Sequence, residues 1–178
     1  MDFPDIVKES DIIIKGKVVE ILPSVEEKPV IVTSEEDAKK AAEKGETCIF
    51  IVSNEKEKEA AKRYSSIIYT DKIIKVEKYL KNPQSKNKII VREEGGKIGD
   101  KEVVVAGITP LKLGDYIILF LKKIPLKNVY FIKGGPQGQY FIQKDLAVCK
   151  GIETKKVSEL EAEIKDPLKL TFPLRPIR

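Results

Sequence analysis

The part of the sequence after residue 66 is a series of short β-branched and aromatic runs separated by glycine and proline, and this pattern most constrains the fold. The runs are 67–80, 88–92, 102–106, 116–121, 129–132 and 139–142. The residues between them include Asn82-Pro83, Gly95-Gly96, Leu113-Gly114-Asp115, Pro125 and Gly134-Gly135-Pro136. Short strands with such turn residues between them are typical of a β-barrel or a β-sandwich. We therefore expect a mainly β (α+β) chain whose antiparallel sheet closes around a shared interior.

Two irregularities in the strand pattern predict bends of the kind that a closed sheet needs. Gly16 lies inside the apolar run 11–22, where a glycine usually marks a bulge or a sharp bend. In the run 67–80 the alternation of apolar residues slips near Asp71, which fits a long, bent strand. Both features favour strands that curl into a barrel.

Residues 24–66 have a different character and predict a small α/β insert. Ser34 precedes three acidic residues and is a typical helix N-cap, while Gly45 is a typical helix stop. Ser53 or Asn54 is suited to cap a second helix. The expected elements are strand 30–33, helix 34–45, strand 47–53 and helix 54–63. This βαβα order predicts one parallel strand pair joined by a right-handed crossover.

We expect one main core, because 178 residues is near the usual size of a single domain. The predicted division is a β-barrel domain of residues 1–23 plus 67–178 and an insert of residues 24–66. A helical turn is expected at 5–10. A short C-terminal helix is also expected, from apolar residues at helical spacing and a proline stop: Val157, Leu160, Ile164 and Pro167. The tail 172–178 either packs on the core or waits for a partner.

The chain contains no histidine, and this absence excludes several functional classes. Imidazole-activated serine or cysteine nucleophiles, histidine-ligated zinc and histidine proton shuttles all need the missing residue. Cys48 and Cys149 have none of the spacings that build zinc sites. We therefore expect no catalytic residue, no metal site and no cofactor. A Cys48–Cys149 disulfide needs an oxidising compartment, and a buried thiol is the preferred interpretation of Cys48.

Carboxylate chemistry needs no histidine, because two acids in different environments suffice for glycosidase-like hydrolysis. The candidate acids are Glu93, Glu94, Asp100, Asp115 and Asp145. Several of them adjoin glycine turns, where solvated acids are common. A structural role is therefore the preferred interpretation, and a carboxylate-dependent hydrolase remains a third hypothesis.

The most concentrated glycine segment runs from Gly134 to Gln139. It matches neither the dinucleotide fingerprint nor the phosphate-binding loop. Between two aromatic β runs it is typical of a hairpin connection with positive φ angles. Loops on rigid scaffolds can also touch ligands. The candidate ligand-binding residues are Lys133, Gly134, Gly135, Gln137, Gln139 and Tyr140.

Charge and aromatic content suggest a nucleic-acid alternative. The chain has 33 basic and 28 acidic residues, and its excess of positive charge is dispersed. The aromatic pairs 130–131 and 140–141 lie beside Lys127, Lys133 and Lys144, as in barrels that stack bases on aromatic rings. Because the basic residues are not clustered, aromatic rings that brace the sheet are the preferred interpretation.

Several segments together resemble a known group of proteins. They are residues 10–20, 69–81, 89–96, 113–121 and 130–141. In this order they are similar to an uncharacterised group of bacterial and archaeal exported β proteins. In outline they resemble the oligonucleotide/oligosaccharide-binding-like (OB-like) barrels of netrin-like and metalloproteinase-inhibitor domains. The resemblance implies a closed or nearly closed antiparallel OB-like barrel and a leader peptide ahead of Asp2.

The resemblance does not imply inhibition. Those inhibitors reach a catalytic zinc with an N-terminal cysteine, whereas this chain starts Met1-Asp2-Phe3. Residues 24–66 also have no counterpart in the resembled pattern. The insert is therefore the feature most expected to distinguish the role of this protein.

The preferred functional hypothesis is a non-enzymatic binding or interaction module that recognises a protein or another surface ligand. An OB-like barrel that binds single-stranded nucleic acid is the alternative. No run approaches the roughly 20 apolar residues that span a bilayer. Removal of a leader would place the protein outside the cytoplasm, and otherwise it is cytoplasmic. The sequence leaves the oligomeric state open.

Overall fold

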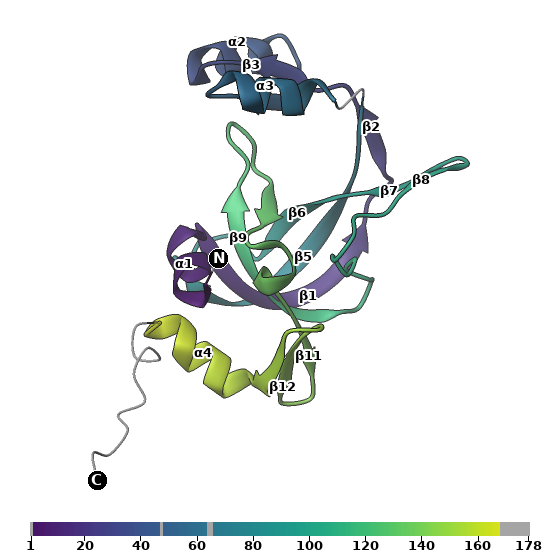
Figure 1. The fold of residues 1–178 in the computed structure, drawn as a ribbon. Helices are drawn as coiled ribbons and strands as arrows, with labels where there is room; N and C mark the ends of the chain where they lie inside the picture. The colour runs from purple at the N-terminus through teal and green to yellow at the C-terminus, as the bar shows by residue number, and fades with distance from the viewer. Residues whose placement is uncertain (1, 47, 64–65, 168–178) are drawn as a thin grey trace.

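The computed structural model describes residues 2–46, 48–63 and 66–167, and its centre is a closed β-barrel (Figure 1). Five strands form a ring in which each strand pairs with the next. In order around the ring they are β1 (Ile12–Ile21), β5 (Ile67–Lys81), β6 (Lys88–Glu94), β10 (Tyr130–Ile132) and β9 (Tyr116–Lys123). Pairing of β1 with β9 closes the ring. The prediction of a mainly β chain with a closed barrel is confirmed.

One seam of the barrel departs from the antiparallel arrangement that the sequence predicts. β6 and β10 run parallel, with Tyr130 opposite Val91. The four other pairs in the ring are antiparallel. Strand directions cannot alternate all the way around a ring with an odd number of strands. A five-stranded barrel therefore needs at least one parallel pair, and here it falls at the shortest strand, β10.

The bend predicted at Gly16 is present in β1. The register between β1 and β5 shifts between Lys15 and Gly16. A Cβ atom on Gly16 would lie 2.4 Å from the carbonyl oxygen of Lys75 on β5, so only glycine lets the two backbones approach this closely. In β5 three consecutive residues, 68–70, are buried. The positions 68, 70, 72 and 74 are nevertheless all buried, and the pairing with β6 is continuous from Tyr69 to Lys75, so the slip predicted near Asp71 is wrong. The apolar pattern changes there because the polar residues Thr70 and Lys72 occupy buried positions.

Two hydrophobic clusters share strands β1 and β9. Twelve buried residues, including Ile12, Ile14 and Leu119, form the cluster that contains the barrel interior. Ile13, Ile118 and Phe120 point to the other face, where they join side chains of α1 (Phe3–Glu9), α4 (Val157–Lys165), β11 (Gln139–Gln143) and β12 (Leu146–Cys149). Successive strand residues face opposite ways, so a strand that is covered on both sides must be apolar throughout. This explains the unbroken apolar runs in β1 and β9.

The hairpin predicted for the glycine segment 134–139 is wrong. β10 and β11 do not pair with each other, because both pair with the same edge of β9. β10 pairs with β9 as far as Leu121, and β11 pairs with it from Leu119. The residues between them loop out as the 3₁₀ turn η1 (Gly135–Gly138), with Gly134 and Gly135 at positive φ. One edge of β9 is thus long enough to pair with two short strands in succession.

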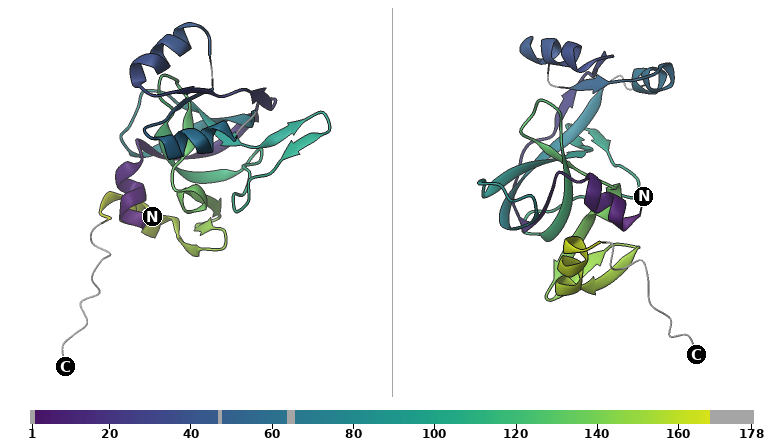
Figure 2. Two further views of the ribbon diagram at one scale, coloured as in Figure 1. Left: turned by 45° about the horizontal axis from the view of Figure 1, so that its top comes forward. Right: turned by 90° about the vertical axis from the view of Figure 1, so that its left-hand side faces the viewer.

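The insert stands off one end of the barrel, and α4 with β11 and β12 lies at the other end (Figure 2). Its elements are β3 (Val30–Val32), α2 (Glu35–Glu43), β4 (Ile49–Ile51) and α3 (Glu55–Lys62). β3 and β4 form the predicted parallel pair. The Ser34 side chain caps α2 and the Asn54 side chain caps α3, as predicted. β2 (Val25–Glu27), which precedes these elements, pairs with β5 of the barrel sheet.

The remaining elements are peripheral. β7 (Gly96–Ile98) and β8 (Lys101–Val103) form a projecting hairpin, and β12 pairs with β13 (Glu153–Lys156). The predicted N-terminal helical turn and C-terminal helix are confirmed as α1 and α4. The predicted tail 172–178 lies outside the described residues.

Replacing Gly16 with alanine should destabilise the barrel by about 1 to 3 kcal/mol, because the new methyl group would overlap the backbone of β5. The free energy of unfolding in urea measures this effect. Glu20→Ala, an exposed change on the same strand, should alter stability by less than about 0.5 kcal/mol. Equal stability of the two variants would contradict the tight contact between β1 and β5.

Candidate functional site

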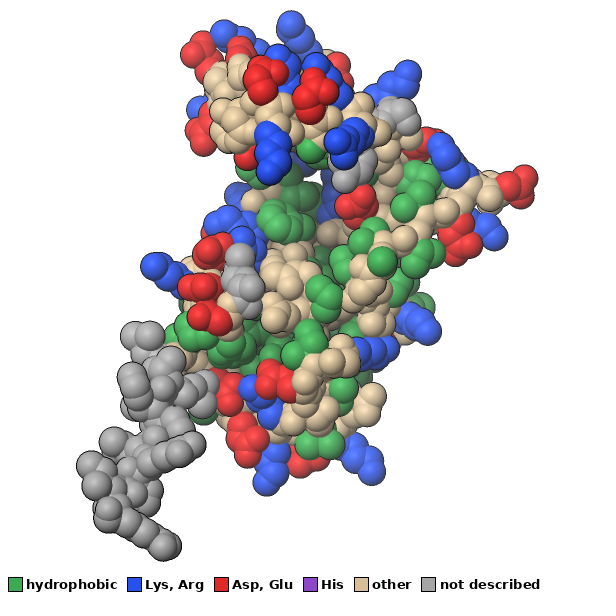
Figure 3. Space-filling model, in the orientation of Figure 1, with side chains coloured by type: hydrophobic (Ala, Val, Ile, Leu, Met, Phe, Trp, Pro, Cys, Tyr) green, Lys and Arg blue, Asp and Glu red, His purple; other side chains and the backbone are tan. Residues whose placement is uncertain are grey.

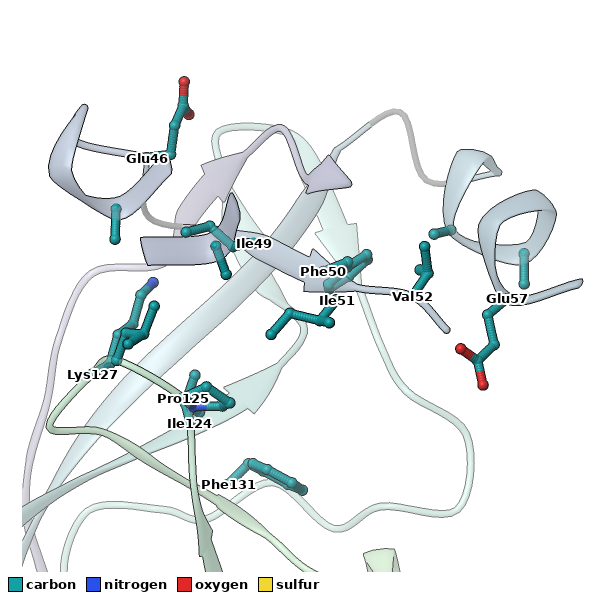
Figure 4. Close-up of a pocket in the computed structure, with 15 residues that line it drawn as sticks. Glu46, Ile49, Phe50, Ile51, Val52, Glu57, Ile124, Pro125, Lys127 and Phe131 are labelled. Atoms are coloured by element: carbon teal, nitrogen blue, oxygen red, sulfur yellow. The ribbon is translucent and has the colours of Figure 1, made fainter. Parts of the chain in front are cut away.

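A cleft lies between the insert and the barrel (Figures 3 and 4). The insert supplies one wall, and the 124–129 turn between β9 and β10 supplies part of the other. The cleft has two adjoining parts, the larger of about 760 Å³ and the smaller of about 470 Å³. Residues that line both parts are Ile49, Phe50, Ile124, Pro125, Lys127 and Phe131. These volumes and the mostly apolar lining are typical of ligand sites.

Strand β4 presents its edge to the larger part of the cleft. The consecutive residues 49–52 all line it, although neighbours along a strand point to opposite faces. β4 pairs with β3 in a two-stranded sheet, so it is an edge strand. Figure 4 shows Ile49, Phe50 and Ile51 on β4 across the cleft from Pro125 and Phe131.

The helices of the insert cover β4 incompletely, because they face it with small residues. Their side chains along the cleft include Ala38, Ala42, Ala60 and Ala61. Ile51 remains 40% exposed, and across the cleft Leu126 is 51% and Phe131 39% exposed. Exposed apolar side chains that gather in one concave place mark an interaction site more often than scattered ones do. The cleft is therefore the candidate binding site.

The smaller part of the cleft has a polar wall built by β5 and β6. The Arg92 guanidinium lies 3.6 Å from the centre of the Tyr69 ring and donates two hydrogen bonds of 2.8 Å to Asp71. The Tyr69 hydroxyl donates to Glu27 at 2.7 Å. Burial and this hydrogen bond raise the pKa of Tyr69 to about 12. These groups satisfy one another and hold a fixed wall.

Lys127 is the charged residue that lines both parts of the cleft. It is half-buried in the 124–129 turn, and in Figure 4 its ammonium group points toward the insert. Among the residues that the structure describes, no acidic side chain forms an ion pair with it. Burial and the positive charge of Arg92 lower the pKa of Lys127, while Glu27 and Cys48 act in the opposite direction. The site thus contains an ammonium group that forms no ion pair with a described side chain.

The six ligand-binding residues predicted from sequence are not gathered around the cleft. Gly135 lines its smaller part, and Lys133 forms an ion pair with Glu9 at 2.5 Å. Gln139 is buried and donates to the carbonyl oxygen of Thr109 at 2.8 Å. Tyr140 is buried and donates to Glu153 at 2.5 Å. Gly134 packs against Ile6, and Gln137 is exposed in η1. A ligand-binding role for these residues stays a prediction.

No protein-family model matches the chain, and no curated protein matches it significantly. The resemblance to netrin-like and metalloproteinase-inhibitor barrels therefore stays a prediction. In the described ranges, no three or more cysteine and acidic side chains gather as a metal ion would require. No helix in those ranges is long and apolar enough to cross a membrane.

The aromatic pairs beside lysines are mostly inside the protein. Tyr130 and Phe141 are buried in the cluster of the barrel interior, and Tyr140 is buried in the second cluster. Phe131 is the exposed member, and it faces the cleft. Of the flanking lysines, Lys127 also lies in the cleft. The sequence places Phe131 and Lys127 in a pattern of basic and aromatic residues, but it does not show that they lie next to β4.

The five candidate carboxylates lie in different surroundings. Glu94, Asp100 and Asp145 are exposed, and Asp115 accepts a hydrogen bond from the backbone of Lys112. Glu93 alone of the five is buried, where it forms an ion pair with Lys72.

The buried pair Lys72–Glu93 is held by Leu111. The Lys72 ammonium donates to the carbonyl oxygen of Leu111 at 2.6 Å, and the Leu111 backbone N–H donates to Glu93 at 3.3 Å. Burial raises the pKa of Glu93, and the hydrogen bond from Lys72 limits the rise. Each charge is matched by its neighbour, so the pair has a structural role in tying residue 111 to the barrel.

Glu93→Leu should destabilise the protein by about 3 to 5 kcal/mol, because it leaves the Lys72 ammonium buried without a carboxylate. The double variant Lys72→Met/Glu93→Leu should recover most of this loss, since it removes both charges. Urea unfolding of the two variants and of Lys72→Met provides the comparison. A double variant that is as unstable as the sum of the two single ones would contradict a coupled pair.

Both cysteines are free, so no disulfide joins Cys48 to Cys149. Cys149 is 1% exposed, and its thiol donates to the carbonyl oxygen of Pro136. Burial raises its pKa to about 11. Cys48 is half-buried and lines the smaller part of the cleft, rather than being fully buried as expected. It lies in the insert, whereas Cys149 lies on β12 beyond the other end of the barrel.

We expect Cys48 to react with a thiol reagent such as DTNB before Cys149 does, because only Cys48 borders an open cleft. Burial and the nearby Glu27 raise the pKa of Cys48, so its reaction rate should still increase as the pH rises above 9.0. Absorbance of the released thiolate measures both phases. Cys48→Ser should remove the faster phase, and a folded protein whose two thiols react at one rate would contradict this assignment.

Proposed function

We propose that this chain is a non-enzymatic binding module that holds an extended apolar segment of a protein partner in the cleft. The observation that carries the proposal is the incomplete cover of β4. Ile51 of the insert and Leu126 and Phe131 of the barrel are large, apolar and exposed, and they line one concave surface. Covering these side chains would remove apolar area from water, which stabilises a complex by roughly 25 cal/mol for each Å² buried.

The form of the cleft supports an extended segment as the occupant. Its two parts adjoin along β4 and the 124–129 turn, so the site is longer than a single round pocket. β4 is also an edge strand, and an extended peptide can add to such an edge through main-chain hydrogen bonds. Apolar pockets on both sides of the segment would then select its side chains.

The barrel supplies rigid support for the site. The 124–129 turn projects from β9, which is paired along both edges and buried on both faces. The closed ring of five strands agrees with the OB-like architecture, whose members bind ligands with varied loops on a constant barrel. In this proposal the insert, which has no counterpart in the resembled barrels, provides the second wall.

A panel of fluorescein-labelled hexapeptides rich in Ile, Val, Leu and Phe, with polar flanks for solubility, tests the proposal by fluorescence anisotropy. At least some members should bind, and Ile51→Asp and Phe131→Asp should each weaken that binding about tenfold or more by placing a charge in the apolar contact. Leu113→Asp is the matched control, because Leu113 is 66% exposed outside the cleft.

The same variants distinguish other occupants. If a small apolar dye such as Nile red binds in the cleft and none of the peptides does, the occupant is a small ligand and not a protein segment. Peptide binding that Ile51→Asp and Phe131→Asp leave unchanged would place the site elsewhere. Circular dichroism of each variant verifies that it is folded.

A further inference from the structure

The charged groups around the cleft differ in whether the protein compensates them. Three are held by partners: Glu57 by Ser53, Arg92 by Asp71 and Glu93 by Lys72. Glu46 and Glu94 also line the cleft and are exposed to water. Lys127 is both half-buried and without an ion-pair partner among the described residues. Its ammonium group is therefore the charge that an occupant of the cleft would meet.

We propose that Lys127 pairs with an acidic side chain of the bound segment, so that the preferred segment carries one Asp or Glu between apolar residues. This inference rests on the proposed function, because it specifies the segment that the cleft binds. Lys127 lines both parts of the cleft, so the residues on either side of the acid would each occupy an apolar part. A side-chain carboxylate in mid-segment fits this central position better than a terminal carboxylate does.

Desolvation explains why the segment should be acidic at this point. A segment lying in the cleft would cover Lys127 and remove water from an ammonium group that is already half-buried. Burying a charge without a partner is costly, whereas a carboxylate at hydrogen-bond distance compensates it. A wholly apolar segment would leave the Lys127 ammonium buried without a partner, whereas an acidic segment would pair with it.

The charges around Lys127 also favour an acidic ligand. Burial and the positive charge of Arg92 lower the pKa of Lys127, which means that they disfavour its charged form. Glu27, Cys48 and Asp71 favour the charged form. Asp71 is held by Arg92, and Glu27 accepts from Tyr69. A carboxylate from the ligand would add the close negative charge that these groups do not supply.

Paired peptides test the inference. Two apolar hexapeptides with acetylated and amidated ends differ only in a central Glu or Gln, and a third has the central Gln with a free C-terminal carboxylate. For the wild-type chain the Glu peptide should bind about fivefold to tenfold more tightly than the Gln peptide, the size expected for one partly buried ion pair. The preference should fall as salt is added.

Variants of the chain locate the preference. Lys127→Gln should bind the Glu and Gln peptides equally, and Lys127→Glu should favour a peptide with a central Lys. Lys88→Gln is the matched control, because it removes the same charge from an exposed position at the start of β6. It should leave the preference for Glu unchanged.

Each outcome separates the inference from the function on which it rests. If none of the peptides binds, the proposed function fails. If the wild-type chain binds the Glu and Gln peptides equally, the function stands and the inference is overturned. A preference for Glu that persists in Lys127→Gln, or a stronger preference for the free C-terminus, also overturns it.

Discussion

β9 is paired along both edges, with β1 on one side and with β10 followed by β11 on the other. Its side chains alternate between the barrel interior and the second cluster, so it is also covered on both faces. It therefore joins the barrel to the second cluster. The pairing with β1 closes the ring, and the sharing of one edge forces η1 to loop out. The turn that leaves the end of β9 supplies part of the barrel wall of the cleft.

The cleft follows from a mismatch within the insert. Four apolar residues in a row, 49–52, form or adjoin β4, but the two helices beside it offer mainly alanines. Among the described residues of the insert, only Ala38, Val52 and Ala61 are buried. A two-stranded sheet with so small a core is marginal by itself. Apolar surface that the insert cannot cover therefore remains at the cleft, opposite Leu126 and Phe131.

Two lysines show how differently the fold treats buried charge. Lys72 is almost fully buried, and it is matched by Glu93 and by the carbonyl oxygen of Leu111. Lys127 is half-buried, and the described part of the protein offers it no ion pair. A buried charge without a partner is unfavourable, so proteins keep such groups mainly where they act. Lys72 therefore has a structural role in an ion pair, whereas Lys127 is suited to recognise a ligand.

Local patterns in the sequence determined many of the elements and some of their details: the short strands of the barrel, the bend at Gly16 and the caps Ser34 and Asn54. Each depends on neighbours along the chain, namely alternation, backbone freedom or a side chain that reaches its own helix. The parallel β6–β10 seam, the docking of β10 and β11 on one edge, the Lys72–Glu93 pair and the cleft were decided only by tertiary structure. The cleft joins residues 48–52 to 124–131, and no local pattern records which distant segments meet when a ring of strands closes.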